Sequence, residues 1–218
     1  EVLDKLGANA TGLPFNSGLA VELTQGAPEN PLVNAGAMST VSLIAAKDKT
    51  DRWNNILNNL SAWADSSLSV NEPVFQSEME TNQHNQALAM LMASYNSFYG
   101  DTREAVEIYT RQCSVDITVE QLAKMGAVLA NKGKSPFNGK QLLNERYVPQ
   151  VLAEMAIAGL YDSSGKWLYT VGIPAKSGVG GGMVAIVPGQ YAIAVYSPPL
   201  DAAGNSVRAQ QTIAYVAE

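Results

Sequence analysis

The segment Lys176-Ser177-Gly178 places a cation and a hydroxyl beside a glycine, and a glycine run, Gly180 to Gly182, follows it. A lysine here can supply positive charge to a substrate carboxylate or help to move a proton, and glycines let a ligand pack directly on backbone N–H groups. Backbone donors that face a developing oxyanion suit acyl transfer. The segment therefore indicates one wall of a serine amidohydrolase site. On the triplet alone, an edge strand followed by a glycine turn is the ordinary alternative.

A second group of polar residues, Glu78, Asn82 and Asn85, has the spacing i, i+4 and i+7, which places the side chains on one helix face. Leu88 and Met92 continue this face, so the stripe is predicted to be half buried. Unpaired polar groups cost about 1–3 kcal/mol each when buried, so the stripe indicates a bound partner, and a zwitterionic ligand would serve. The alternative is a solvated helix end whose side chains pair locally.

The histidine and cysteine content excludes several kinds of chemistry. One histidine, His84, and one cysteine, Cys113, supply too few ligands for a zinc or iron site, so no metal is expected. His84 is interpreted as a surface or packing residue, which argues against a Ser-His-Asp triad. A single cysteine forms no internal disulfide, which favours a reducing compartment and predicts a cytoplasmic protein.

Composition and charge limit the partners. The 218 residues are 46% hydrophobic and 16% charged, which suits one domain, or one large domain with a subdomain. With 14 Lys and Arg against 20 Asp and Glu, the net charge is −6, and no basic cluster exceeds two residues, so no nucleic-acid partner is expected. No apolar run approaches the roughly 20 residues that span a bilayer, and the start is unlike a secretory signal, so no membrane partner is expected.

The elements that must position these residues follow from hydrophobic spacing and capping signals. Helices are predicted at Ala35–Ala46, Arg52–Trp63, Ser77–Tyr95, Asp101–Arg111, Thr118–Gly133, from beyond Asn144 to Gly159, and at Asn205–Ala217. Antiparallel strands are predicted at Lys166–Val171, Met183–Val187 and Tyr191–Ser197. A helical block followed by a sheet that a terminal helix covers is an α+β arrangement. We interpret residues 1–218 as a single domain, with a helical region at about 35–160 and the sheet with its terminal helix at about 161–218.

Several short motifs together resemble the serine-dependent glutaminases, and most closely their shorter bacterial members. They occur in the family's order from Val2 to the end, and they are Asn30-Pro-Leu-Val-Asn34-Ala-Gly36-Ala, Phe75-Gln-Ser-Glu78 with Asn85, Tyr109 before Gln112-Cys-Ser, Gly159-Leu-Tyr161, Lys176-Ser-Gly-Val179-Gly-Gly, and Ser197-Pro-Pro-Leu-Asp201 with Gly204-Asn-Ser206. The resemblance implies the fold of serine β-lactamases and penicillin-binding transpeptidases, which is a sheet packed by helices with a helical subdomain. It also implies hydrolysis of L-glutamine to glutamate and ammonia, no cofactor, and a homo-oligomer, dimer or tetramer.

The resemblance also assigns the substrate-binding positions, which are Asn34, Glu78, Asn85, Tyr109, Tyr161 and the backbone of Val179. Glu78 is expected to face the ligand's ammonium group, and Asn34, Asn85 and Tyr109 are expected to donate hydrogen bonds to its α-carboxylate. Tyr161 could relay a proton between the nucleophile and the leaving ammonia, and the Val179 N–H would form half of an oxyanion hole. For Lys176 an electrostatic role and a structural ion pair both stay open.

One departure from the family concerns the nucleophile. In the family the serine that forms the acyl-enzyme lies in a Ser-x-x-Lys helical turn where the lysine can deprotonate it, and this serine is expected to be absent from this chain. The match at Ser163 to Lys166 is interpreted as a decoy in a turn between helix and strand. The chain is therefore expected to be an N-terminally incomplete glutaminase, inactive alone. The alternatives are a β-lactamase-like amidohydrolase that acts on another amide, and a non-catalytic relative that binds amino acids.

Overall fold

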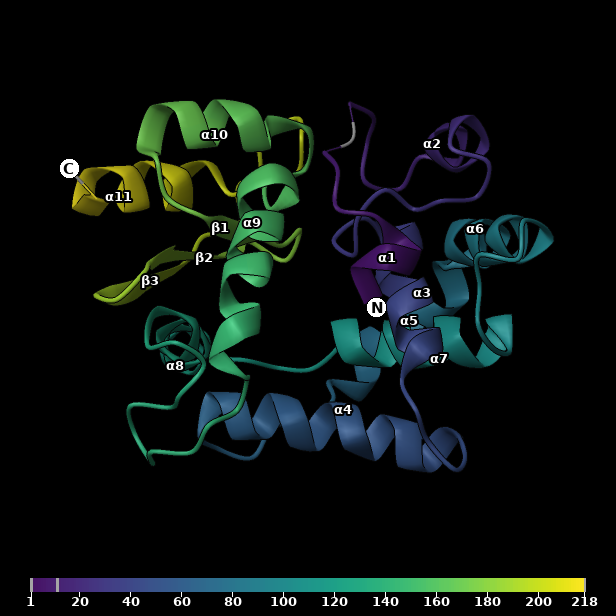
Figure 1. Ribbon diagram of the computed structural model, residues 1–218, viewed down its shortest axis with the longest axis horizontal. Helices are drawn as coiled ribbons and strands as arrows, with labels where there is room; N and C mark the ends of the chain where they lie inside the picture. Colours follow the sequence, from purple (N-terminus) through teal and green to yellow (C-terminus); the bar gives the residue numbers. More distant parts are fainter. Residues whose placement is uncertain (1, 11, 218) are drawn as a thin grey trace. The chain divides into compact units, whose positions relative to one another are not determined.

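The computed structural model describes residues 2–10 and 12–217, and it divides the chain into two units (Figure 1). The first unit comprises Glu1–Leu60 and Leu68–Asp116, and the second comprises Ser61–Ser67 and Ile117–Glu218. Helix α4, Lys49–Ala64, contributes its first residues to one unit and its last residues to the other.

The first unit is helical, and its core surrounds helix α3. Its other helices are α1 (Val2–Leu6), α2 (Gly18–Leu23), α5 (Glu72–Thr81), α6 (Gln83–Ser94) and α7 (Thr102–Cys113). Helix α3, Asn34–Leu43, carries small and apolar residues and packs against α6 and α7. Met38 of α3, Met92 of α6 and Val106 of α7 are buried in one cluster. The buried helix predicted at Ala35–Ala46 is thus present, slightly shortened at its C-terminal end.

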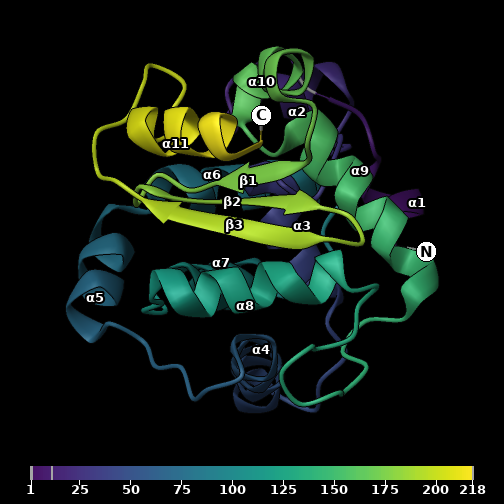
Figure 2. The same ribbon diagram turned by 90° about the vertical axis from the view of Figure 1, so that its left-hand side faces the viewer.

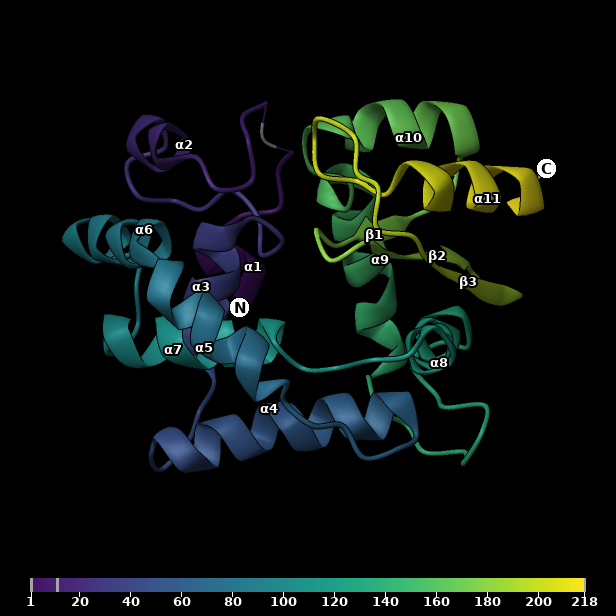
Figure 3. The ribbon, with the colours of Figure 1, turned by 180° about the vertical axis from the view of Figure 1, so that it is seen from behind.

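The single helix predicted at Ser77–Tyr95 is wrong, because the chain bends at Asn82 into α5 and α6 (Figure 3). Asn82 is buried, with φ −88° and ψ 18°, which is outside the helical range. Its amide nitrogen donates to Thr110 Oγ1, and its Oδ1 accepts from Gln86 Nε2. Asparagine often replaces backbone hydrogen bonds in this way at helix ends. The periodicity of the apolar residues gave no sign of the bend.

The second unit contains a three-stranded antiparallel sheet with the order β1-β2-β3, formed by Ala175–Ser177, Gly182–Val187 and Tyr191–Tyr196. Its helices are α8 (Val119–Ala130), α9 (Val148–Ala158), α10 (Ser164–Val171) and α11 (Val207–Ala217), with 3-10 turns at Glu145–Tyr147 and Tyr161–Ser163. Ser177 pairs with Met183, and Met183 pairs with Val195. The helices and the antiparallel sheet confirm the predicted α+β class.

Helices cover both faces of this sheet, with α11 on one side and α8 on the other (Figure 2). Side chains alternate along β2, so Met183 belongs to the cluster with Ile213 of α11, whereas Ile186 belongs to the cluster with Leu129 at the end of α8. Helix α8 approaches the strands closely at Gly126, where an added Cβ would lie 2.7 Å from the Cβ of Ala192.

The strand predicted at Lys166–Val171 is wrong, because these residues lie in helix α10. Short apolar runs do not distinguish a strand from a helix by periodicity alone. Trp167 is buried and Val171 packs against the same cluster, which is the i, i+4 spacing of one helix face. The helix ends at Gly172, whose φ of +79° gives the left-handed cap that glycine favours.

Candidate functional site

Three of the predicted site residues form one hydrogen-bonded group in the first unit. Asn34 Nδ2 donates to Asn85 Oδ1 at 3.0 Å, and the Tyr109 hydroxyl donates to Asn34 Oδ1 at 3.3 Å. The residues come from α3, α6 and α7, and each is half-buried. The structure thus joins side chains that are up to 75 positions apart in sequence. Amide and phenol groups in this arrangement can hydrogen-bond a carboxylate.

The loop before α3 holds Asn34 in place. Asn30 is fully buried, and its Oδ1 accepts from the backbone N–H groups of Leu32 and Val33. Its carbonyl packs on Gly36, where an added Cβ would lie 1.9 Å from that oxygen, so only glycine permits the approach. The Asn34 N–H donates to the Phe15 carbonyl. No role was predicted for Asn30, which fixes the start of α3.

Glu78 lies in the same unit, on α5, but it is exposed and has no hydrogen bond to the other three predicted residues within residues 2–10 and 12–217. The predicted polar stripe is therefore split by the bend between α5 and α6. Asn82 is satisfied by Thr110 and Gln86 within the protein, so its burial requires no ligand.

Tyr161, Lys176 and Val179 belong to the second unit. The Tyr161 hydroxyl donates to the Ser177 carbonyl at 3.4 Å, and Lys176 Nζ donates to the same carbonyl. Lys176 Nζ also lies 4.6 Å from the centre of the Tyr161 ring. A cation at this distance from the ring is attracted by its π face. Tyrosine and lysine thus meet at the end of β1.

Val179 lies in the turn between β1 and β2, and 56% of its surface is exposed. The N–H groups of Gly178 and Gly181 donate within this turn, to the carbonyls of Gly182 and Gly178. In the part of the chain that the structure describes, the Val179 N–H has no such acceptor. A backbone donor left in this way is suited to an incoming oxyanion.

The loop after β3 supports this end of the sheet, although no role was predicted for it. Asn205 is fully buried and lies against both Ser177 and Leu160. Asp201 Oδ1 accepts from the N–H groups of Ala203 and Asn205, and Gly204 has a φ of +96°. An aspartate followed by a glycine is an ordinary turn signal, which could have identified this loop from the sequence.

Two carboxyl groups in the second unit have shifted pKa values. Burial raises the pKa of Asp201, but hydrogen bonds from the Asn205 N–H, the Gln210 side chain and other backbone N–H groups outweigh it, so the pKa lies below its usual value. Burial raises the pKa of Glu154, which has 5% of its surface exposed. Its Oε2 has no hydrogen-bond partner among the described atoms.

The Ser163 to Lys166 match lies at the start of helix α10, so its interpretation as a turn between a helix and a strand was wrong. Ser163 is half-buried and Lys166 is exposed. Across residues 2–10 and 12–217, no hydrogen bond connects the two side chains, so they are not arranged as nucleophile and base.

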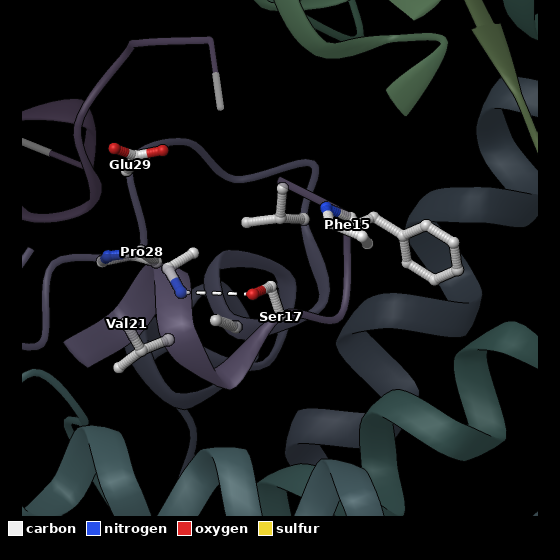
Figure 4. Close-up of a pocket in the computed structure, with 9 residues that line it drawn as sticks. Phe15, Ser17, Val21, Pro28 and Glu29 are labelled. Atoms are coloured by element: carbon white, nitrogen blue, oxygen red, sulfur yellow. Dashed lines mark hydrogen bonds between the residues drawn. The ribbon is translucent and has the colours of Figure 1, made fainter. Parts of the chain in front are cut away.

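A small pocket lies in the first unit under the N-terminal loop, beside Phe15, Ser17, Val21, Pro28 and Glu29 (Figure 4). Its interior of about 10 Å³ has room for roughly one water molecule, and none of the predicted site residues lines it. Ser17 points into it while capping α2, whose Ala20 N–H donates to the Ser17 hydroxyl. We interpret it as a packing defect.

The described residues contain no group of three or more His, Cys, Asp and Glu side chains that could hold a metal ion. They also include no helix long and apolar enough to cross a membrane. His84 is exposed, and its Nε2 lies 2.6 Å from the Asn16 carbonyl.

Comparison with known proteins identifies relatives along the whole chain. The glutaminase family model matches residues 1–218. A glutaminase of Colwellia psychrerythraea is 53% identical over 221 residues, which cover 100% of this chain and 70% of the relative. A solved structure described as a probable glutaminase, ybaS, is 50% identical with a TM-score of 0.96, and the match covers 99% of this chain and 70% of that one.

A third relative is the Bacillus subtilis glutaminase YbgJ, which is 29% identical with a TM-score of 0.88 over 99% of this chain and 71% of that one. Its structure is described as a covalent complex with 5-oxo-L-norleucine, formed by reaction with 6-diazo-5-oxo-L-norleucine.

Proposed function

The chain belongs to the glutaminase family of amidohydrolases, which hydrolyse glutamine to glutamate and ammonia, and from this premise we propose how its residues take part in the reaction. Its fold is the predicted serine-hydrolase type, resembling that of β-lactamases, because its structural neighbours are bacterial glutaminases. The observation that carries the proposal is the hydrogen-bonded group of Asn34, Asn85 and Tyr109.

This first-unit group is proposed to bind the α-carboxylate of L-glutamine. Asn34 holds Asn85 through the Asn85 Oδ1, so Asn85 can donate its Nδ2 hydrogens to an incoming carboxylate, and the Tyr109 hydroxyl can turn its proton from Asn34 Oδ1 to the same carboxylate. Hydrogen bonds to a charged group contribute about 1.5–3 kcal/mol each, which suits selection of a free amino acid. Glu78 is proposed to pair with the ammonium group, because its carboxylate is exposed and not engaged by these three side chains.

The second-unit residues are proposed to carry the chemistry. A serine Oγ attacks the carboxamide carbon, ammonia leaves, and water then hydrolyses the acyl-enzyme ester to release glutamate. The Val179 N–H stabilises the oxyanion, and the Tyr161 hydroxyl passes the serine proton to the leaving ammonia. The covalent complex of the Bacillus subtilis relative supports a covalent intermediate.

Lys176 is proposed to act electrostatically. Its ammonium group lies next to the Tyr161 ring, where its positive charge can stabilise negative charge that develops on the site during proton transfer. A structural role is the competing explanation, because Lys176 also donates to the Ser177 carbonyl. Lys176→Met separates the two, since an electrostatic role predicts a changed pH profile of kcat, whereas a structural role predicts a lower Tm.

The proposal for the whole protein is a homo-oligomer, dimer or tetramer, that acts in the cytoplasm. Residues 1–218 are proposed to form one glutaminase domain, which the extent of the family match supports. Light scattering coupled to size-exclusion chromatography of the full-length protein tests the oligomeric state, and a monomer at working concentration would contradict it.

The test of substrate recognition uses ammonia release by the full-length protein. Glutaramate is glutamine without its α-amino group, so it cannot pair with Glu78. Glu78→Gln is expected to raise KM for glutamine about 10- to 100-fold and to leave the weak activity on glutaramate unchanged. Glu80→Gln, on the same exposed helix, is the matched control. An equal loss of activity on both substrates would show that Glu78 does not bind the ammonium group.

A further inference from the structure

Asn205 connects the two backbone segments that carry the proposed catalytic groups. The Ser177 hydroxyl donates to Asn205 Oδ1, and Asn205 Nδ2 donates to the Leu160 carbonyl at 3.2 Å. Ser177 precedes the turn that contains Val179, and Leu160 precedes Tyr161. All three of these bonded residues have no more than 3% of their surface exposed. One amide side chain thus bridges β1 and the turn after α9.

The backbone of Tyr161 requires such support. Its φ is +56°, a conformation that residues other than glycine rarely adopt. An unfavourable backbone conformation persists only where its surroundings hold it, and such positions cluster at active sites. The peptide between Leu160 and Tyr161 sets this φ, and Asn205 holds the carbonyl of that peptide. Ser164 holds the backbone on both sides of this peptide, because its hydroxyl accepts from the Leu160 N–H and donates to the Tyr161 carbonyl.

Asn205 is itself fixed by its loop. The Asp201 N–H donates to the Asn205 carbonyl at 2.8 Å, and the Asn205 N–H donates to Asp201 Oδ1 at 2.9 Å. Gln210 of α11 donates to the other carboxylate oxygen of Asp201. The loop also lies close to the site, because a Cβ added to Gly204 would be 3.4 Å from Val179 Cγ1 and 3.6 Å from Tyr161 Cε2.

We propose that Asn205 is a positioning residue, which holds the Tyr161 hydroxyl at a fixed place relative to the backbone that carries the Val179 N–H. The proposal rests on the proposed catalytic roles of Tyr161 and Val179. It assigns a function to a side chain that contacts neither the substrate nor the reacting atoms. Misplacing a catalytic group by about 1 Å can lower a rate by roughly 100-fold, so the effect should be large.

The experiment is a double-mutant cycle in the full-length protein. Asn205→Ala is expected to lower kcat for glutamine about 10- to 100-fold with little change in KM, because the proposed recognition residues lie in the first unit. Tyr161→Phe lowers kcat directly. If Asn205 acts through Tyr161, the double variant is no slower than Tyr161→Phe alone. If the two factors multiply, Asn205 does not act through Tyr161 and the proposal is overturned.

Two further variants separate positioning from stability. Ile213→Ala removes a fully buried side chain of α11 in the same unit and should lower Tm while keeping kcat per folded enzyme. Ser177→Ala removes one end of the Asn205 bridge and should lower kcat in the same direction as Asn205→Ala, which keeps the test available if Asn205→Ala does not fold. Unchanged kcat in folded Ser177→Ala and Asn205→Ala would overturn the proposal.

The cycle also separates this inference from the proposed function. If Tyr161→Phe retains wild-type kcat, the catalytic role of Tyr161 fails and the positioning proposal fails with it. If Tyr161→Phe lowers kcat but Asn205→Ala does not, the proposed function stands and the positioning role alone is wrong.

Discussion

At the scale of single residues, the sequence identified the polar residues of the site better than it identified the residues that hold them in position. Asn34, Asn85 and Tyr109 were expected to act together, and they are hydrogen-bonded to each other. Asn30, Asn205 and the positive φ of Tyr161 were not expected. Their importance depends on contacts between distant segments and on backbone geometry, neither of which leaves a local pattern in the sequence.

Glu154 provides a prediction for stability. Burial raises its pKa in the folded state, so its contribution to stability is present below the unfolded pKa, near 4.3, and is lost as pH rises through the folded pKa. Glu154→Gln removes the buried charge. At pH 8 the variant is therefore expected to be more stable than wild type by about 1 kcal/mol, which raises Tm by a few degrees, and at pH 4 its Tm should be close to that of wild type.

Differential scanning calorimetry across this pH range measures the difference. The exposed Glu80→Gln is the control and should shift Tm by less than about one degree at either pH. A Glu154→Gln variant that is less stable than wild type at pH 8 would mean that the ionised carboxylate has a partner in solution.

At the scale of elements, capping signals located helices well and apolar spacing located them less well. Thr118 and Gln121 form a capping box where the helix predicted at Thr118–Gly133 begins, and Asp101 caps α7 where the helix predicted at Asp101–Arg111 begins. In contrast, the bend at Asn82 and the helix at Ser164–Val171 depend on tertiary contacts. The short α2 was also missed, although Ser17 caps it, because glycines and prolines surround it in the sequence.

Close packing between α8 and the sheet gives the next prediction. Gly126→Ala would place a Cβ 2.7 Å from Ala192 Cβ and 2.8 Å from Val184 Cγ2, so it is expected to destabilise the protein by about 1–3 kcal/mol. Gly165→Ala, in α10, has no heavy atom within 4 Å of the added Cβ and should be neutral or stabilise by up to about 1 kcal/mol.

Chemical denaturation of the two variants side by side measures both effects. Equal stabilities would show that α8 moves away from β2 and β3 without cost.

At the scale of the whole molecule, the proposed roles divide between the two units. The residues proposed to recognise the amino acid belong to the first unit, and they are Asn34, Glu78, Asn85 and Tyr109. The residues proposed to carry the reaction belong to the second unit, and they are Tyr161, Lys176 and Val179. The resemblance to a family predicted these residues and the general fold. The boundaries of the two units did not follow from composition, which suggested one domain, or one large domain with a subdomain.

This division predicts different kinetic effects. Asn85→Ala should raise KM for glutamine about 10- to 100-fold with a smaller effect on kcat. Tyr161→Phe should lower kcat about 100- to 10,000-fold with a smaller effect on KM. Steady-state kinetics of the full-length protein checks both, and His84→Ala, next to Asn85 on the exposed surface, should change neither constant. A fall in kcat alone for Asn85→Ala would place that residue with the reacting groups.

The Asn205 bridge affects the order in which the chain folds during its synthesis on the ribosome. Its bond to the Leu160 carbonyl joins residues 45 positions apart, so the Tyr161 turn cannot take its supported conformation until the chain has been made well beyond β3. Contacts between distant positions form late because they close long loops. The first unit can begin to fold while this segment is still being synthesised, so Tyr161, the proposed proton relay, is among the last groups to reach its final position.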